Sequence, residues 1–147
     1  MIIQQISVFV ENKPGTLAEV LHALKEHDVN LRALSVADTA DFGILRMVVN
    51  EPEKVEKMLR DAGYAVKSTP VLTIAISDKP GGLLTEVEKL SAAGINVEYV
   101  YAFAAKSATE ARVVFKVDNL EMAARIINGE SAGAAGKEKG EVPEFYW

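Results

Sequence analysis

The stretch Glu11-Asn12-Lys13-Pro14-Gly15-Thr16-Leu17 separates two kinds of hydrophobic pattern. Before it, residues 2–10 alternate between apolar and polar side chains, which is typical of a half-buried strand. Thr16, with Glu19 three residues later, fits a capping box and predicts the start of a helix. After the stretch, apolar residues recur at helical spacing, at Leu17, Val20, Leu21 and Leu24. The stretch is therefore predicted to be a strand-to-helix turn.

The same turn occurs a second time, as Ser77-Asp78-Lys79-Pro80-Gly81-Gly82-Leu83. Pro80 stands 66 residues after Pro14, and Asn96 stands at the same distance from Asn30. A fixed internal offset indicates a repeated structural unit. We therefore predict two domains, at 1–68 and 69–129, followed by a flexible tail at 130–147.

Each unit is predicted to follow the order βαββαβ, which makes the chain an α+β protein. In the first unit we expect strands at 2–10, 29–37, 44–49 and 64–66, with helices from Leu17 and from Pro52. In the second we expect strands at 71–77, 95–104 and 111–117, with helices from Leu83 and from Leu120. Residues 67–70 are predicted to be a short linker.

The second unit lacks an obvious fourth strand, because Gly129 to Glu141 is a linker-like mixture of Gly, Ala, Lys and Glu. We expect 130–141 to be mobile. The segment Val142-Pro143-Glu144-Phe145-Tyr146-Trp147 is the remaining candidate for that strand, and its proline restricts it to a sheet edge. The sequence leaves open what replaces the strand.

Composition excludes several classes of function. The net charge of −5 argues against a nucleic-acid binder, and the absence of cysteine excludes a disulfide framework and thiolate chemistry. No apolar run reaches the roughly 18 residues of a membrane helix, and the start shows no secretory signal, so we expect a cytoplasmic protein. His22 and His27 lie five residues apart, which does not suit a shared metal on one helix face. We expect no metal, no cofactor and no catalytic residue.

The repeated Lys-Pro-Gly turn, the paired Asn30 and Asn96, and the run Arg32-Ala33-Leu34-Ser35-Val36-Ala37-Asp38-Thr39 resemble those of ACT-domain proteins, specifically stand-alone tandem pairs. The resemblance covers about residues 3–128. It implies two ferredoxin-like domains, each a four-stranded antiparallel sheet with two helices on one face. It also implies that the sheets pair side by side, with a small effector, usually an amino acid, bound at the seam.

The turns are chemically suited to such a ligand. Amide N–H groups at a helix start lack intrahelical partners and favour a carboxylate, while Asn12 or Asp78 offers an acceptor for an ammonium group. The resemblance implies one site of Asn12, Lys13, Pro14, Gly15, Thr16, Leu17, Asn96 and Val97. It implies a second site of Asp78, Lys79, Pro80, Gly81, Gly82, Leu83, Asn30 and Leu31.

The choice between the two sites stays open. Thr16 can cap its own helix, whereas Gly82 cannot, so the second turn is expected to leave freer N–H groups. Asn12, however, matches the ligand-holding asparagine of the family better than Asp78 does. The alternative is that both turns are only favourable strand–helix connections.

Two further groups of residues are candidates. The hairpin between the second and third strands lies at the same end as the turn, so ligand contact or ordinary turn chemistry is expected for Asp38, Thr39, Asp41 and Phe42. Alternating aromatic residues share one face of their strand, which we expect to be the sheet face away from the helices. We interpret Tyr99, Tyr101 and Phe103 as a homodimer interface. The alternatives are a ligand platform, or coverage of these residues by the C-terminal tail of the same chain.

The sequence thus predicts a non-catalytic amino-acid sensor or effector-binding regulatory subunit. A second hypothesis is a ligand-free dimerisation module whose partner is a metabolic enzyme. A third is an enzyme of ferredoxin-like fold, which is disfavoured because no acid–base pair stands out. The sequence does not identify the amino acid or the partner.

Overall fold

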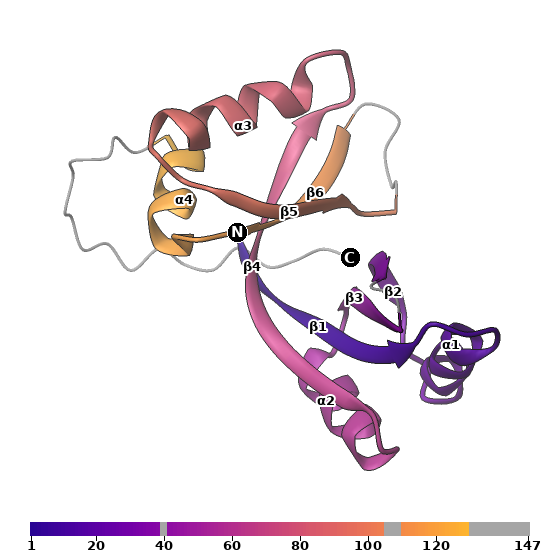
Figure 1. The fold of residues 1–147 in the computed structure, drawn as a ribbon. Coiled ribbons are helices and arrows are strands. Elements are labelled where there is room, and N and C mark those ends of the chain that lie inside the picture. The colour runs from indigo at the N-terminus through magenta and orange to yellow at the C-terminus, as the bar shows by residue number, and fades with distance from the viewer. Residues whose placement is uncertain (39–40, 105–109, 130–147) are drawn as a thin grey trace. The chain divides into compact units, whose positions relative to one another are not determined.

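The computed structural model describes residues 1–38, 41–104 and 110–129. Figure 1 shows the strands and helices of these residues. Their order is β1 (Ile2–Glu11), α1 (Thr16–Glu26), β2 (Leu31–Asp38), β3 (Phe42–Val49), α2 (Pro52–Asp61), β4 (Ala65–Ser77), α3 (Gly82–Ala92), β5 (Val97–Ala102), β6 (Glu110–Val117) and α4 (Leu120–Ile127). Segments 130–141 and 142–147, for which mobility and a fourth strand were predicted, lie outside the described residues.

The chain divides into two compact units. The first unit is Gln4–Pro70, and the second combines Met1–Ile3 with the described residues from Val71 onward. The prediction of a linker at 67–70 is wrong, because β4 runs through these residues without a break. A strand with apolar residues at both ends satisfies its backbone groups better by continuing in a sheet than by leaving it.

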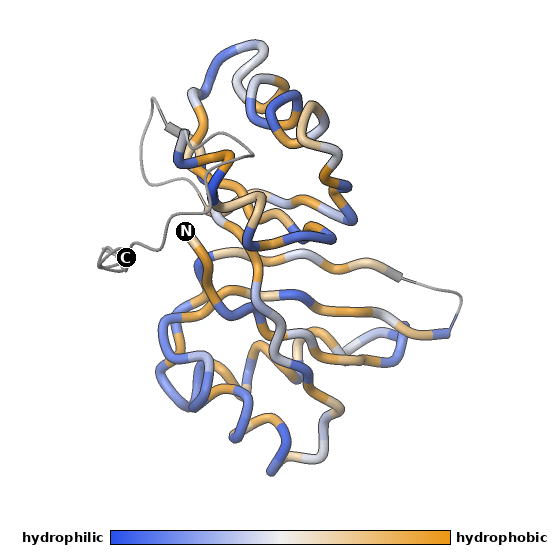
Figure 2. The backbone as a smooth tube through the Cα atoms, turned by 90° about the vertical axis from the view of Figure 1, so that its left-hand side faces the viewer, coloured by the Kyte–Doolittle hydropathy of each residue, from blue (hydrophilic) through white to orange (hydrophobic). Residues whose placement is uncertain are grey.

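The first unit has the strand order β2-β3-β1-β4, in which β3 is antiparallel to both β1 and β2. Ile6 is opposite Met47, and Leu45 is opposite Val36, which fixes the faces of these strands. Both helices cover the same face, because one core joins the apolar residues of α1 and α2 to those of β1 and β3. The buried members include Ile6, Val8, Val10, Val20, Leu24, Leu45, Met47, Val55 and Leu59. Figure 2 shows apolar and polar residues interleaved along the helices, as an amphipathic pattern requires.

The second unit repeats this arrangement with the strand order β4-β6-β5. Its core includes Leu72 of β4, Phe115 of β6, Leu90 of α3 and Ala123 of α4. The predicted α+β class, with antiparallel sheets and helices on one face of each, is confirmed. No helix in the described residues is long and apolar enough to cross a membrane.

The N-terminal residues occupy the fourth-strand position of the second unit. Thr73 donates its backbone N–H to the carbonyl oxygen of Met1 at 2.7 Å, and the amine of Met1 donates to the carbonyl oxygen of Thr73 at 3.1 Å. Two reciprocal backbone bonds of this kind are the pattern of an antiparallel pair. Met1–Ile3 therefore pairs with β4 at the place where a fourth strand of the second unit would lie.

Candidate functional site: two turns before helices

The first turn contains Gly15 in a left-handed conformation, with φ = +92°. This glycine precedes α1, whose first residue is Thr16. Asn12 donates its backbone N–H to the carbonyl oxygen of Asp41 at 3.2 Å, so the β2–β3 hairpin lies beside the turn as predicted. Whether the hairpin contacts a ligand stays a prediction. Thr39 lies outside the described residues.

The predicted capping box of Thr16 and Glu19 is wrong. Thr16 is already helical, so its hydroxyl points back into the turn and donates to the carbonyl oxygens of Glu11 (2.7 Å) and Lys13 (3.0 Å). Glu19 instead accepts a hydrogen bond from the hydroxyl of Tyr64 at 2.7 Å. The cap position belongs to Gly15, which has no side chain to contribute.

The second turn has the same design. Gly81 precedes α3 with φ = +86°, and no side chain caps this helix either. The predicted difference in capping between the two turns is therefore wrong, since both helices begin after a left-handed glycine. Gly82, at the position equivalent to Thr16, donates its N–H to the carbonyl oxygen of Lys79 at 3.0 Å.

Both turns leave unpaired amides at the start of their helices. Within the residues that the structure describes, no acceptor is found for the backbone N–H groups of Leu17, Ala18, Leu83 and Leu84. Such groups carry the positive end of the helix dipole and attract an anion. Asn12 and Asp78, the predicted ammonium acceptors, are both exposed. The turns thus present donors for a carboxylate and acceptors for an amine.

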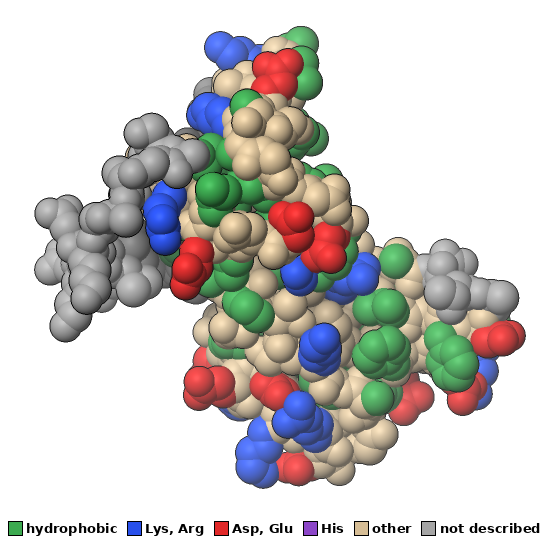
Figure 3. All heavy atoms as spheres, turned by 60° about the vertical axis from the view of Figure 1, so that its left-hand side comes forward, with side chains coloured by type: hydrophobic (Ala, Val, Ile, Leu, Met, Phe, Trp, Pro, Cys, Tyr) green, Lys and Arg blue, Asp and Glu red, His purple; other side chains and the backbone are tan. Residues whose placement is uncertain are grey.

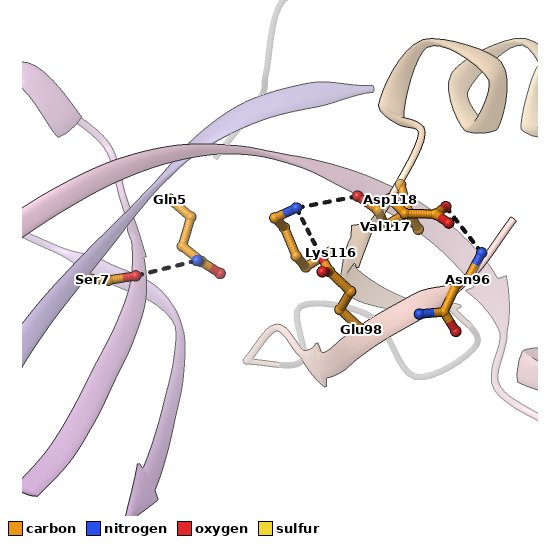
Figure 4. Close-up of polar contacts among 7 residues, drawn as sticks. All are labelled: Gln5, Ser7, Asn96, Glu98, Lys116, Val117 and Asp118. Carbon is orange, nitrogen blue, oxygen red and sulfur yellow. Dashed lines mark hydrogen bonds and ion pairs between the residues drawn. The ribbon is translucent and has the colours of Figure 1, made fainter.

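At the openings of β2 and β5, an exposed asparagine is followed by an apolar residue that packs against a core. Asn30 and Asn96 are exposed. Asn96, directly before β5, donates its backbone N–H to Oδ1 of Asp118 at 3.0 Å, while its side-chain amide is directed away from Asp118 (Figure 4). Leu31 and Val97 pack against the apolar cores. Ligand contact by these four residues stays a prediction.

The aromatic residues of β5 face away from the helices, as predicted. Val100 is opposite the core residue Phe115, whereas Tyr101 is opposite Val114 on the other face of the sheet. The rings of Tyr99 and Tyr101 stack, with centroids 6.4 Å apart. Both rings are half-buried, and their role as a dimer interface stays a prediction.

The sequence missed a cavity of about 240 Å³ beside the first turn. It is lined by residues of the first unit that include Phe9, Glu11, Lys13, Thr16, Glu19 and Tyr64. A hydrogen bond from Lys13 to Glu11 raises the pKa of the lysine, and the charges of Glu11 and Glu19 add to this effect. Burial, and then the bond to Glu19, raise the pKa of Tyr64 to about 12. Tyr64 is 45 residues from Glu19, and no local sequence signal joins them.

Acidic and histidine side chains in the described residues form no group of three or more able to hold a metal ion. On the face drawn in Figure 3, basic and acidic side chains are interspersed rather than gathered into a basic patch.

Comparison with known proteins gives the chain a family. A family model described as an ACT domain pair matches residues 1–133. The crystal structure of protein BT0572 from Bacteroides thetaiotaomicron is 40% identical, with a TM-score of 0.82 and 88% of each chain covered. The ligand-free regulatory subunit of aspartate kinase from Thermus thermophilus shares the fold, at 16% identity and a TM-score of 0.65, over 88% of this chain and 96% of that one. No curated protein matches the sequence.

Proposed function

Because the chain belongs to the ACT domain pair family, we propose that it is a non-catalytic regulatory protein that binds a small amino acid. The observation that carries this proposal is the pair of turns with left-handed glycines and unpaired amides at Leu17, Ala18, Leu83 and Leu84. A carboxylate fits these donors. The proposal keeps both predicted residue sets, including Asn96 and Val97 for the first turn and Asn30 and Leu31 for the second.

Regulation would follow from a difference in affinity. A ligand shifts the equilibrium between two arrangements of a protein only if it binds one of them better. A regulatory subunit of aspartate kinase is among the proteins of the same fold, which supports an enzyme as the partner. The amino acid is then the signal, and the change in domain or chain packing is the response that the partner senses.

The proposal is tested by thermal unfolding of the full chain in the presence of each of the twenty common amino acids. A ligand that binds only the folded state raises Tm, because at 100 times its Kd it adds about 2.7 kcal/mol to the free energy of unfolding. We expect one amino acid, or a chemically related few, to raise Tm in a saturable way. If none does, the proposal fails and the ligand-free dimerisation module becomes the better account.

A further inference from the structure

The residues that line the cavity beside the first turn include two carboxylates, Glu11 and Glu19, but a single cation, Lys13. Lys13 and Glu11 form an ion pair, with Nζ and Oε2 2.8 Å apart, so these two lining residues balance each other. The hydrogen-bond partner of Glu19 is the neutral phenol of Tyr64. The carboxylate of Glu19 is therefore the uncompensated charge among the lining residues, and the cavity favours a cationic group.

The fold holds this carboxylate in place. Tyr64 packs against the apolar core of the first unit, and its backbone N–H bonds the carbonyl oxygen of Leu59 at 3.0 Å. Its hydroxyl donates to Oε1 of Glu19, which leaves Oε2 without a hydrogen bond among the described residues. Phe9, another lining residue, is 46% exposed and offers an aromatic surface, which also attracts cations.

We propose that this cavity binds the ammonium group of a small ligand, with Glu19 as its acceptor and Tyr64 as the residue that positions Glu19. The inference rests on the proposed function in that the natural ligand is then the amino acid. Lys13 and Thr16 belong both to the first turn and to the cavity lining, so one ligand can meet both. An ammonium group has three N–H donors, so Glu19 acts beside Asn12, the acceptor that the sequence offered at the first turn.

The inference also makes the two turns unequal. At the 66-residue offset, Thr85 replaces Glu19 and Ser77 replaces Glu11. The second unit therefore lacks both carboxylates at the equivalent positions. We infer that the ammonium site belongs to the first unit.

The first experiment uses two probes of similar shape and opposite charge, n-propylamine and propionate. The full chain is labelled with ¹⁵N and titrated at neutral pH, and the backbone amides of Gly63 and Tyr64, which line the cavity, are followed by NMR. We expect both amides to shift in a saturable way with propylamine and to remain unshifted with propionate. Unshifted amides with propylamine, or equal shifts with both probes, overturn the inference.

The second experiment measures propylamine affinity in variants. Glu19→Gln keeps the size of the side chain but removes its charge, and should weaken binding by at least about tenfold. Glu53→Gln, at an exposed position in the first turn of α2, is the matched control and should bind like the wild type. Wild-type affinity in Glu19→Gln contradicts the inference.

The positioning role of Tyr64 needs its own readout, because Tyr64→Phe also removes a hydrogen bond from the fold. The carboxyl ¹³C resonance of Glu19 should shift when propylamine binds the wild type. In Tyr64→Phe, with a folded NMR spectrum, the shift at saturation should be smaller and the affinity lower. An unchanged shift and affinity contradict the role.

These outcomes separate the inference from the proposed function. If an amino acid raises Tm equally in the wild type and in Glu19→Gln, the cavity inference fails and the proposed function stands. If propylamine shifts Gly63 and Tyr64 but no amino acid raises Tm, the ammonium site stands and the proposed function fails.

Discussion

Gly82 and Thr16 occupy equivalent positions in the two turns, but their surroundings differ. A Cβ atom built on Gly82 would overlap the carbonyl oxygen of Ser77. At Thr16 the corresponding space holds a side chain whose hydroxyl bonds the carbonyl oxygen of Glu11. The second turn is therefore more tightly closed, and its backbone occupies the place of the threonine side chain.

Replacing Gly82 by alanine should destabilise the second unit. Because the added methyl group meets backbone rather than a movable side chain, we expect a loss of about 1–3 kcal/mol in the free energy of unfolding, measured by urea denaturation. Ser91→Ala, at an exposed position of α3, should change it by less than about 0.5 kcal/mol. If Gly82→Ala and Ser91→Ala are equally stable, the turn has room for the added methyl group and the prediction is contradicted.

Tyr64 gives a prediction about pH. Its pKa in the folded protein is about 12, above the ordinary phenol value of 10.0. A group whose pKa is raised by folding stabilises the protein fully below its unfolded-state pKa, and this contribution is lost as the pH rises toward the folded-state value. Stability attributable to Tyr64 should therefore fall between about pH 10 and pH 12.

The measurement is a spectrophotometric tyrosine titration, with denaturation curves at the same pH values. Tyr64→Phe should remove the ionisation near pH 12 and make stability less dependent on pH in that range. If Tyr64→Phe shows the same late ionisation as the wild type, the assignment is contradicted.

At this scale the sequence located the turns but misjudged the caps. The motif of Thr16 and Glu19 has the right spacing for a capping box, yet Gly15 takes the cap position because its left-handed φ turns the chain into the helix. Glu19 is then free to bond Tyr64, which the fold brings from 45 residues away. A local motif does not contain that information.

At the scale of elements, β4 is the strand that the sequence described least well. Its two ends were predicted as separate strands at 64–66 and 71–77, but β4 continues through 67–70, where short polar residues and Pro70 favoured a linker. Pairing with a neighbouring strand decides such a case, and the pairing partner is not visible in the local pattern. The amphipathic helices, in contrast, were predicted because their 3.6-residue period is a local property.

The N-terminal strand should protect β4 from solvent exchange. In a variant that starts with methionine at position 3, Thr73 loses the carbonyl oxygen of Met1 that accepts its N–H. We expect the amide of Thr73 to exchange with deuterium at least about tenfold faster, while buried amides of the first unit, such as that of Val48, keep their rates. Equal protection of Thr73 in both chains would mean that Met1–Ile3 does not act as the fourth strand.

At the scale of the whole molecule, the internal repeat was the most informative feature of the sequence. It predicted the two units, their antiparallel sheets and the equivalent turns, because a repeat reports on topology rather than on one local segment. It could not show that Met1–Ile3 groups with the second unit, since a strand contributed from the other end of the chain breaks the period. The same limit applied to the cavity, whose walls come from β1, α1 and the α2–β4 connection.

The central claim is that the two turns bind an amino acid, and titration calorimetry tests it most directly. The amino acid that raises Tm most is titrated into the wild type, Asn12→Ala and Asp78→Ala. The account predicts that at least one variant loses about tenfold or more in affinity, because its turn loses one acceptor for the ammonium group. Wild-type affinity in both variants would contradict it.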